Sequence, residues 1–164
     1  MTLEETDRII DYFYDATPEA LELQGVDPSR FPLVSQWRRF HQQLYEQPIE
    51  QRSHFMVSWL DGDRFVGFSV TDSIKFGQQA HMHLHIVEPS LRNSGIGAAC
   101  VKASVEIYFQ TLQLKRLFCE PHAFNVAPNR TVQKAGFKFV KTHMTVPGPI
   151  NFHQPVNRWV IERG

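Results

Sequence analysis

Arg92-Asn93-Ser94-Gly95-Ile96-Gly97 decides how the chain folds, because this segment joins an extended apolar stretch to a long amphipathic helix. The residues before it, 81–89, read HMHLHIVEP; they alternate like a β-strand and stop at a proline. After it, apolar side chains recur at helical spacing, at Ile96, Cys100, Ala103 and Ile107. The sequence therefore predicts a strand, a glycine-rich turn and a helix in direct succession.

The glycines of this turn favour a phosphate ligand. A helix start offers backbone N–H groups without partners and the positive end of the helix dipole, which together bind phosphate without a charged side chain. Gly95 and Gly97 carry no Cβ, so a phosphate can approach the main chain closely. A glycine-capped turn that binds no ligand is the structural alternative.

Two familiar phosphate loops match this segment poorly. A P-loop needs a lysine followed by serine or threonine after its glycines, and none is present here. A dinucleotide loop could use Gly95-Ile96-Gly97, with Glu120 as the acidic residue about 20 positions on. However, Cys100 stands where the third glycine belongs, and the first glycine does not directly follow the strand.

A third interpretation draws on a second segment as well. The R-x-x-G-x-G pattern of Arg92 to Gly97 follows a strand that ends in V-x-P, and Asn125 precedes Gly136-Phe137 with N-x(10)-G-F spacing. Both patterns resemble the GNAT superfamily, the GCN5-related N-acetyltransferases, over roughly Phe65 to Val140. The resemblance is closest to the branch of ribosomal-protein alanine acetyltransferases.

This resemblance implies that acetyl-CoA is the acyl donor and that an amine of a small molecule or peptide is the acceptor. Backbone groups of His85, Ile86 and Val87 would bind the pantetheine arm like an added strand. Asn125 would also contact the cofactor, as would Asn129. The pyrophosphate would lie against the loop and first helical turn, at Arg92, Asn93, Ser94, Gly95, Ile96, Gly97 and Ala98.

Glu120 is the predicted general base. It stands five positions before Asn125, the offset of the catalytic glutamate in the branch that this chain resembles. Independently, a carboxylate that ends the apolar run 117–119 is expected at a strand end, where burial raises its pKa. The alternative is a structural carboxylate that supports the loop 121–125. Many members carry a general-acid tyrosine seven residues after the asparagine. Here Val132 takes that place, so either His122, another side chain or water is the acid, or no acid is needed.

Three histidines alternate along the predicted strand. His81, His83 and His85 share one face, because side chains alternate with period two. Such a set, followed by Glu88, could bind metal as in a cupin, but a cupin is all-β and a helical pattern follows here. We therefore expect no metal, and we expect the histidines to line the acceptor cleft, with His83 or His85 assisting proton removal near neutral pH.

Composition narrows the class of protein. A chain of 164 residues with 42% apolar content predicts a single domain spanning 1–164. Seventeen basic and seventeen acidic side chains cancel, which disfavours nucleic acid and membrane surfaces as partners. The acidic amino-terminal segment is not a signal peptide, and Cys100 and Cys119 are expected to be free thiols, so we predict a cytoplasmic protein. The sequence is compatible with a homodimer.

Periodicity along the rest of the chain predicts an α+β fold: a mixed, mostly antiparallel central sheet flanked by helices, with a βαβαβ carboxyl-terminal half. Helices are expected at 3–14, 33–46, 96–112 and 128–135. Strands are expected at 54–60, 64–72, 81–87, 117–120, 137–146 and 156–162, with hairpins at Asp61-Gly62-Asp63 and around Gly77. The functional prediction is an acetyl-CoA-dependent N-acetyltransferase. A catalytically silent acetyl-CoA-binding module and a cupin-like metal enzyme are its rivals.

Overall fold

The sheet has the mixed, mostly antiparallel form that the sequence predicts. The computed structural model describes residues 1–91 and 94–164. Six strands form one sheet in the order β1-β2-β3-β4-β6-β5. The strands are β1 (Phe55–Asp61), β2 (Arg64–Lys75), β3 (Gln79–Ile86), β4 (Arg116–Cys119), β5 (Lys138–Thr145) and β6 (Gln154–Glu162).

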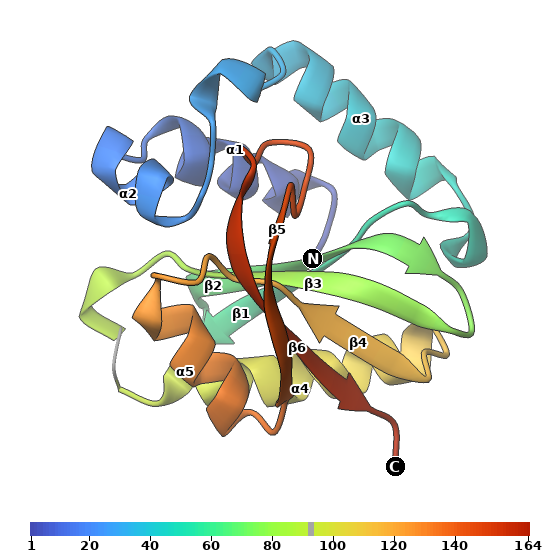
Figure 1. Cartoon of the computed structure of the whole chain (residues 1–164). Helices are drawn as coiled ribbons and strands as arrows, with labels where there is room; N and C mark the ends of the chain where they lie inside the picture. Colours follow the sequence, from blue (N-terminus) through green and yellow to red (C-terminus); the bar gives the residue numbers. More distant parts are fainter. Residues whose placement is uncertain (92–93) are drawn as a thin grey trace.

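The helices cover the two faces of this sheet unequally. One face carries α1 (Asp7–Tyr14), α2 (Pro18–Leu23) and α3 (Val34–Glu46), and we call it the upper face after its position in Figure 1. The lower face carries α4 (Ile96–Thr111) and α5 (Val126–Lys134). Short 3-10 turns lie at Glu4–Thr6, Pro28–Arg30, Ile49–Gln51 and Pro89–Leu91.

Most predicted elements are confirmed within a few residues, and the differences have local causes. Thr2 and Glu5 make both hydrogen bonds of the expected capping box, but the first turn is 3-10 and α1 begins only at Asp7. Helix α2 is absent from the sequence-based prediction, because prolines on both sides of it favour breaks. Its start is nevertheless regular: Thr17 accepts a hydrogen bond from the Ala20 N–H, and Pro18 occupies the first helical position.

The lower face of the sheet holds the larger apolar core. Val101, Val105 and Tyr108 of α4 pack there against Met82 and Leu117 of the sheet. A buried polar network fixes the helix to the strands: the Trp59 indole donates to Ser104 Oγ over 2.8 Å, and Ser69 Oγ bonds both Ser104 and the Tyr108 hydroxyl. Because these polar atoms have partners, they can be buried at little cost.

The parallel pairing of β3 with β4 is short. It comprises four residue pairs and ends at Met82 with Cys119. Beyond that pair β3 continues along β2 as far as Ile86, whereas the chain after β4 follows β6. Two backbone hydrogen bonds hold it there, from the Asn157 N–H to the Pro121 carbonyl and from the Ala123 N–H to the Pro155 carbonyl. The two strands therefore diverge and leave an opening in the sheet.

Strand β6 enters between β4 and β5 and is antiparallel to both. The predicted βαβαβ order is present along the chain, but β5 pairs with β6 and lies at the edge of the sheet. The loop between β5 and β6 rises from the sheet toward α1 (Figure 1). The sheet and its last hairpin thus frame the upper face.

A buried glycine fastens this last hairpin to the loop after α2. The Gly25 carbonyl accepts three hydrogen bonds, from Asn151 Nδ2 at 3.0 Å, Gln154 Nε2 at 2.8 Å and the Phe152 N–H at 3.2 Å. Gly25 has φ +70°, and a Cβ there would lie 1.8 Å from Gln154 Oε1. Only glycine suits both the backbone and the space at this point.

We predict that Gly25→Ala destabilises the protein far more than Gly62→Ala. Gly62 also has positive φ, +62°, but a Cβ there meets nothing within 4 Å, so it reports backbone strain alone. That strain costs about 1–2 kcal/mol. Gly25→Ala should lose a further 1–3 kcal/mol or so, because the buried amides of Gln154 and Asn151 are displaced from their acceptor. Urea unfolding of both variants measures the difference, and equal losses would contradict the role of the Gly25 carbonyl.

Candidate active site

The glycine turn lies at the amino terminus of α4, as predicted. Helix α4 begins at Ile96, and Gly95 caps it with φ +88°. The Ala99 N–H bonds the Gly95 carbonyl, but within the described residues no hydrogen bond is found from the N–H groups of Gly97 or Ala98. Ser94 Oγ donates to the Leu91 carbonyl and accepts from the Ile96 N–H over 3.4 Å. The predicted ligands Arg92 and Asn93 lie outside the described residues.

Gly97 places this turn directly against the end of β3. A Cβ at Gly97 would lie 2.9 Å from Ile86 Cδ1. Ile86 belongs to the part of β3 that has left β4, so the helix terminus and the opening in the sheet adjoin. An elongated ligand can therefore contact the N–H groups of the turn and the edge of β3 together.

The predicted backbone contacts of β3 agree only in part with the hydrogen bonding of the strand. The Val87 N–H already donates to the Val66 carbonyl, which assigns it to the β2 side. Because hydrogen-bonding directions alternate along a strand, His85 also faces β2, whereas Leu84 and Ile86 direct their peptide groups toward the opening. Of the three predicted residues, Ile86 keeps the required direction, and Leu84 is a candidate contact that the sequence analysis missed.

The two predicted asparagine ligands differ in how their side chains are used. Asn125 is the N-cap residue of α5, and its side-chain amide makes no hydrogen bond within the described residues. The Asn129 amide, in contrast, donates to the carbonyls of His122 and Asn125 and accepts from Asn157 Nδ2 and the Trp159 indole. A cofactor contact at Asn129 would require one of these bonds to break, so its evident role is to position Asn125.

Glu120 is the first residue of its segment beyond the last β3–β4 pair, and it lies on the upper face. Arg158 Nε donates to Glu120 Oε1 over 2.6 Å, and His143 Nε2 lies 2.8 Å from the same oxygen. His81 Nδ1 is 3.6 Å from the other oxygen. Glu120 is thus buried, with 8% exposure. Side chains from three strands, β3, β5 and β6, hold its carboxylate.

The pKa expected for Glu120 must be corrected. Burial does raise the pKa of this carboxyl, but the interactions with His81, His143 and Arg158 outweigh it and lower the pKa to about 2. The burial follows from the local sequence, whereas the three partners come from other strands, β3, β5 and β6. At neutral pH Glu120 is a firmly ionised carboxylate.

The three histidines of β3 share one face, as expected, but they have separate surroundings. His83 Nε2 lies 2.9 Å from Asp72 Oδ2. His85 packs among aromatic rings, with Phe68, Phe13 and Tyr12 centroids 4.9, 5.1 and 5.1 Å away. Burial lowers the pKa of His85 to about 3, so this imidazole is too weakly basic to remove a proton at neutral pH. Its predicted catalytic role is therefore not favoured by its surroundings.

The separate surroundings of the three histidines argue against a cupin-like metal site. No group of three or more metal-binding side chains converges within residues 1–91 and 94–164. The mixed sheet with helices on both faces also differs from the all-β architecture that a cupin requires. The cupin-like interpretation is therefore abandoned.

Comparison with known protein families decides the class of the chain. The sequence profile of the acetyltransferase (GNAT) domain matches residues 1–138. The chain belongs to the GNAT acetyltransferase family. This confirms the resemblance and the enzyme class that the glycine loop and the asparagine segment predicted. No sequence among curated proteins matches the chain significantly.

Solved structures show the same fold for this GNAT acetyltransferase. The ribosomal-protein acetyltransferase RimL in complex with coenzyme A superposes with a TM-score of 0.75 at 16% identity, covering 99% of this chain and 90% of RimL. The aminoglycoside acetyltransferase AAC(6')-Ib with ribostamycin and coenzyme A gives 0.72 at 17%, covering 99% and 90%. A point variant of the spermidine N-acetyltransferase SpeG of Vibrio cholerae gives 0.70 at 13%, covering 99% and 92%.

Several residues of this GNAT site escaped the sequence analysis. Asp72 of β2, His143 of β5 and Arg158 of β6 meet His83 and Glu120 only through strand pairing. Strand alternation places Asp72 on the histidine face only when the β2–β3 register is known. The insertion of β6 beside β4, which brings in Arg158, had no local signal in the sequence.

The place of the missing tyrosine is apolar, since Val132 is fully buried in the lower core. His122, one candidate for the general acid, accepts a hydrogen bond at Nδ1 from the Phe124 N–H over 3.2 Å. Burial lowers the pKa of His122. Neither feature favours His122 as a proton donor at neutral pH.

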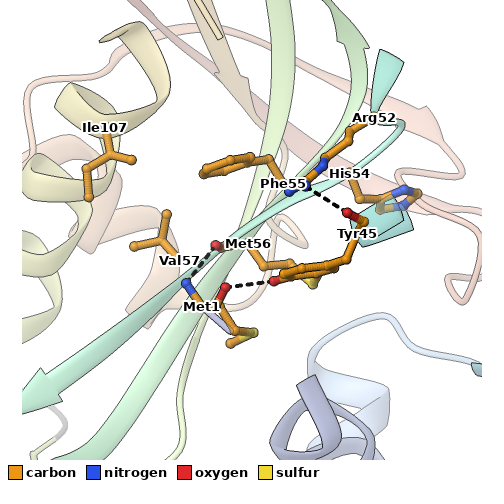
Figure 2. Close-up of a pocket in the computed structure, with 8 residues that line it drawn as sticks. All are labelled: Met1, Tyr45, Arg52, His54, Phe55, Met56, Val57 and Ile107. Carbon is orange, nitrogen blue, oxygen red and sulfur yellow. Dashed lines mark hydrogen bonds between the residues drawn. The ribbon is translucent and has the colours of Figure 1, made fainter. Parts of the chain in front are cut away.

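A separate hollow of about 230 Å³ lies beside β1, and Figure 2 shows the residues that line it. Its polar groups are already bonded: Tyr45 donates to the Met1 carbonyl, and Arg52 donates to the carbonyls of Tyr45 and Gln47. None of the predicted site residues lines it. We assign it no part in the GNAT site.

Within the described part of the chain, no helix is long and apolar enough to cross a membrane. The cytoplasmic location, the single-domain organisation and the homodimer stay predictions.

Proposed function

We propose that the protein is an acetyl-CoA-dependent N-acetyltransferase that transfers the acetyl group directly to an amine. The observation that carries the proposal is the opening between β3 and β4. The N–H groups of the α4 terminus adjoin one end of it at Ile86. His83 and Glu120 face each other across its narrow end, just past the last strand pair.

The dimensions of this arrangement suit a long thioester. Ile86 and His83 are three residues apart on β3, which corresponds to about 10 Å of strand. The pyrophosphate of acetyl-CoA would bind at Gly97 and Ala98, and the pantetheine amides would pair with the peptide groups of Leu84 and Ile86. The thioester then lies near the narrow end, where the upper face supplies polar side chains. The coenzyme A bound in RimL and AAC(6')-Ib, which share this fold, supports the choice of donor.

Glu120 needs a role that agrees with its low pKa. The sequence predicts a general base, but a carboxylate with a pKa of about 2 is a weak proton acceptor at neutral pH. We propose instead that Glu120 is a fixed anion that holds the amine of the acceptor next to the thioester. Arg158 and His143 keep its charge and orientation constant during the reaction.

The acceptor would reach this site from the upper face. The loop between β5 and β6 and the loop after α2 are joined through the Gly25 carbonyl and form one wall. The structural relatives act on a ribosomal protein, an aminoglycoside and spermidine, which are all amines of different size. We propose an amine acceptor of small-molecule or peptide type for this chain.

The competing function is a module that binds acetyl-CoA without turning it over. Val132 in place of the usual tyrosine is the observation in its favour. The fixed carboxylate of Glu120 and the nearby His83 favour an enzyme, because a binding module has no need of polar groups at the thioester. An assay separates the two functions.

The cofactor proposal predicts that coenzyme A raises the melting temperature of the protein by binding the native state. Gly97→Val should abolish this shift, because its side chain fills the approach to the N–H groups and displaces Ile86. Ala99→Val is the matched control: it lies exposed on the same helix, and its N–H already bonds Gly95, so its shift should persist. An unchanged shift in Gly97→Val, or stabilisation by NADH in place of coenzyme A, would refute the proposed cofactor.

The transferase proposal predicts release of free thiol from acetyl-CoA in the presence of an amine from a panel of polyamines, aminosugars and peptides. With the best amine, Glu120→Gln should raise the KM for the acceptor without a comparable loss of kcat at neutral pH. If Glu120 were the base, kcat would instead fall by about 10²–10⁴-fold and recover at high pH. Absence of turnover with every amine, despite coenzyme A binding, would favour the silent module.

A further inference from the structure

His83 is held by a buried carboxylate that no sequence pattern pointed to. In the β2–β3 register Asp72 stands opposite His81, so it lies diagonally next to His83 on the upper face. His83 Nε2 is 2.9 Å from Asp72 Oδ2, and Asp72 is only 7% exposed. Within the described residues, the other carboxylate oxygen of Asp72 has no hydrogen-bond partner.

The loop between β5 and β6 closes this pair from above. A Cβ at Gly148 would lie 3.6 Å from His83 Cε1 and 3.8 Å from Asp72 Oδ2. The ring is thus confined between the carboxylate on one side and the loop on the other. Its side chain keeps 26% exposure, and His83 Nδ1 makes no hydrogen bond within the described residues.

His83 and its partner Asp72 lie next to the opening between β3 and β4. His83 on β3 and Glu120 after β4 are the first upper-face residues beyond the last strand pair, on opposite sides of the opening. If acetyl-CoA binds as proposed above, the thioester and the amine lie between them. One side chain there is a fixed anion, and the other is an imidazole with a free nitrogen.

We propose that His83 is the catalytic residue that moves the proton, and that Asp72 is its positioning residue. The inference rests on the proposed acetyl transfer. With Asp72 ionised, Nε2–H donates to it and leaves the Nδ1 lone pair free. The amine nitrogen bonds to the thioester carbon, and its proton passes to Nδ1. The C–S bond then breaks with its electron pair on sulfur, and the imidazolium returns the proton to the thiolate, giving the N-acetyl amide and the thiol of coenzyme A.

The same imidazole also acts as the general acid. Many family members use a tyrosine for this step, and here the buried Val132 takes its place. One imidazole can accept the proton from the amine and then donate it to the thiolate. The usual choice between a base and a separate acid is therefore unnecessary here.

The charged and titratable groups around His83 set its pH dependence. Burial lowers the pKa of His83, but the charges of Asp72 and Glu120 and the bond to Asp72 raise it overall. His54, which precedes β1, is held neutral by burial, which lowers its pKa, and His85 on the same strand is neutral as well. His81, also on β3, faces Glu120, and the loop residues 147–149, which cover the pair, carry no titratable group.

Proton removal needs neutral imidazole, so kcat should rise as pH rises through the pKa of His83. Asp72→Asn removes the charge that raises this pKa, so the acid limb of the profile should move to lower pH. The limiting rate should fall as well, because the amide no longer fixes the tautomer of the ring.

The experiment compares His83→Gln, Asp72→Asn and the control Asp63→Asn, which replaces an exposed aspartate in the turn between β1 and β2. We expect His83→Gln to lower kcat by at least about 10²-fold. Asp72→Asn should lower kcat and shift its acid limb, and Asp63→Asn should match the wild type. Coenzyme A should stabilise all three equally, which separates this test from a failure of the cofactor proposal.

A second readout does not depend on turnover. The NMR titration of the His83 Cε1–H resonance should show a lower pKa in Asp72→Asn than in the wild type. Wild-type kcat in His83→Gln would overturn the proposal. It would also be overturned by an acid limb and a His83 titration that stay unchanged in Asp72→Asn.

Discussion

Within the described residues β3 pairs with β4 over four residues, and the position of the site follows from where this pairing ends. β3 remains bonded to β2 while the chain after β4 is bonded to β6, so the two strands diverge after Met82 and Cys119. Past that point, β3 directs the peptide groups of Leu84 and Ile86 toward the opening and away from β2. The opening therefore suits a ligand that carries amides of its own, and α4 begins beside it.

The two faces of the sheet have opposite chemistry at this opening. On the lower face, Met82 and Cys119 are buried in the apolar core. On the upper face, the next residues are His83 and Glu120. Asp72 bonds to the His83 imidazole, and Arg158 bonds to the Glu120 carboxylate. Pairing compensates for the burial of these charges. The surrounding groups also shift the two pKa values in opposite directions. The pKa of Glu120 is lowered, so this carboxylate stays ionised, whereas the pKa of His83 is raised.

Local patterns predicted what depends on local sequence. The glycine turn, the helix after it, the two hairpins and the shared face of the histidines all follow from residues close together in the chain. The insertion of β6 between β4 and β5 joins segments more than 30 residues apart, and it alone brings Arg158 to Glu120. For this reason the burial of Glu120 was anticipated and its low pKa was not. Asp72 was missed because its partnership with His83 depends on the strand register.

A crystal structure of the protein with coenzyme A tests the central claim most directly. The account predicts the pantetheine arm in the opening between β3 and β4, with its amides bonded to the peptide groups of Leu84 and Ile86. The pyrophosphate should contact the N–H groups of Gly97 and Ala98, and the sulfur should lie between His83 and Glu120. Coenzyme A bound elsewhere, or a sulfur atom far from both side chains, would contradict it.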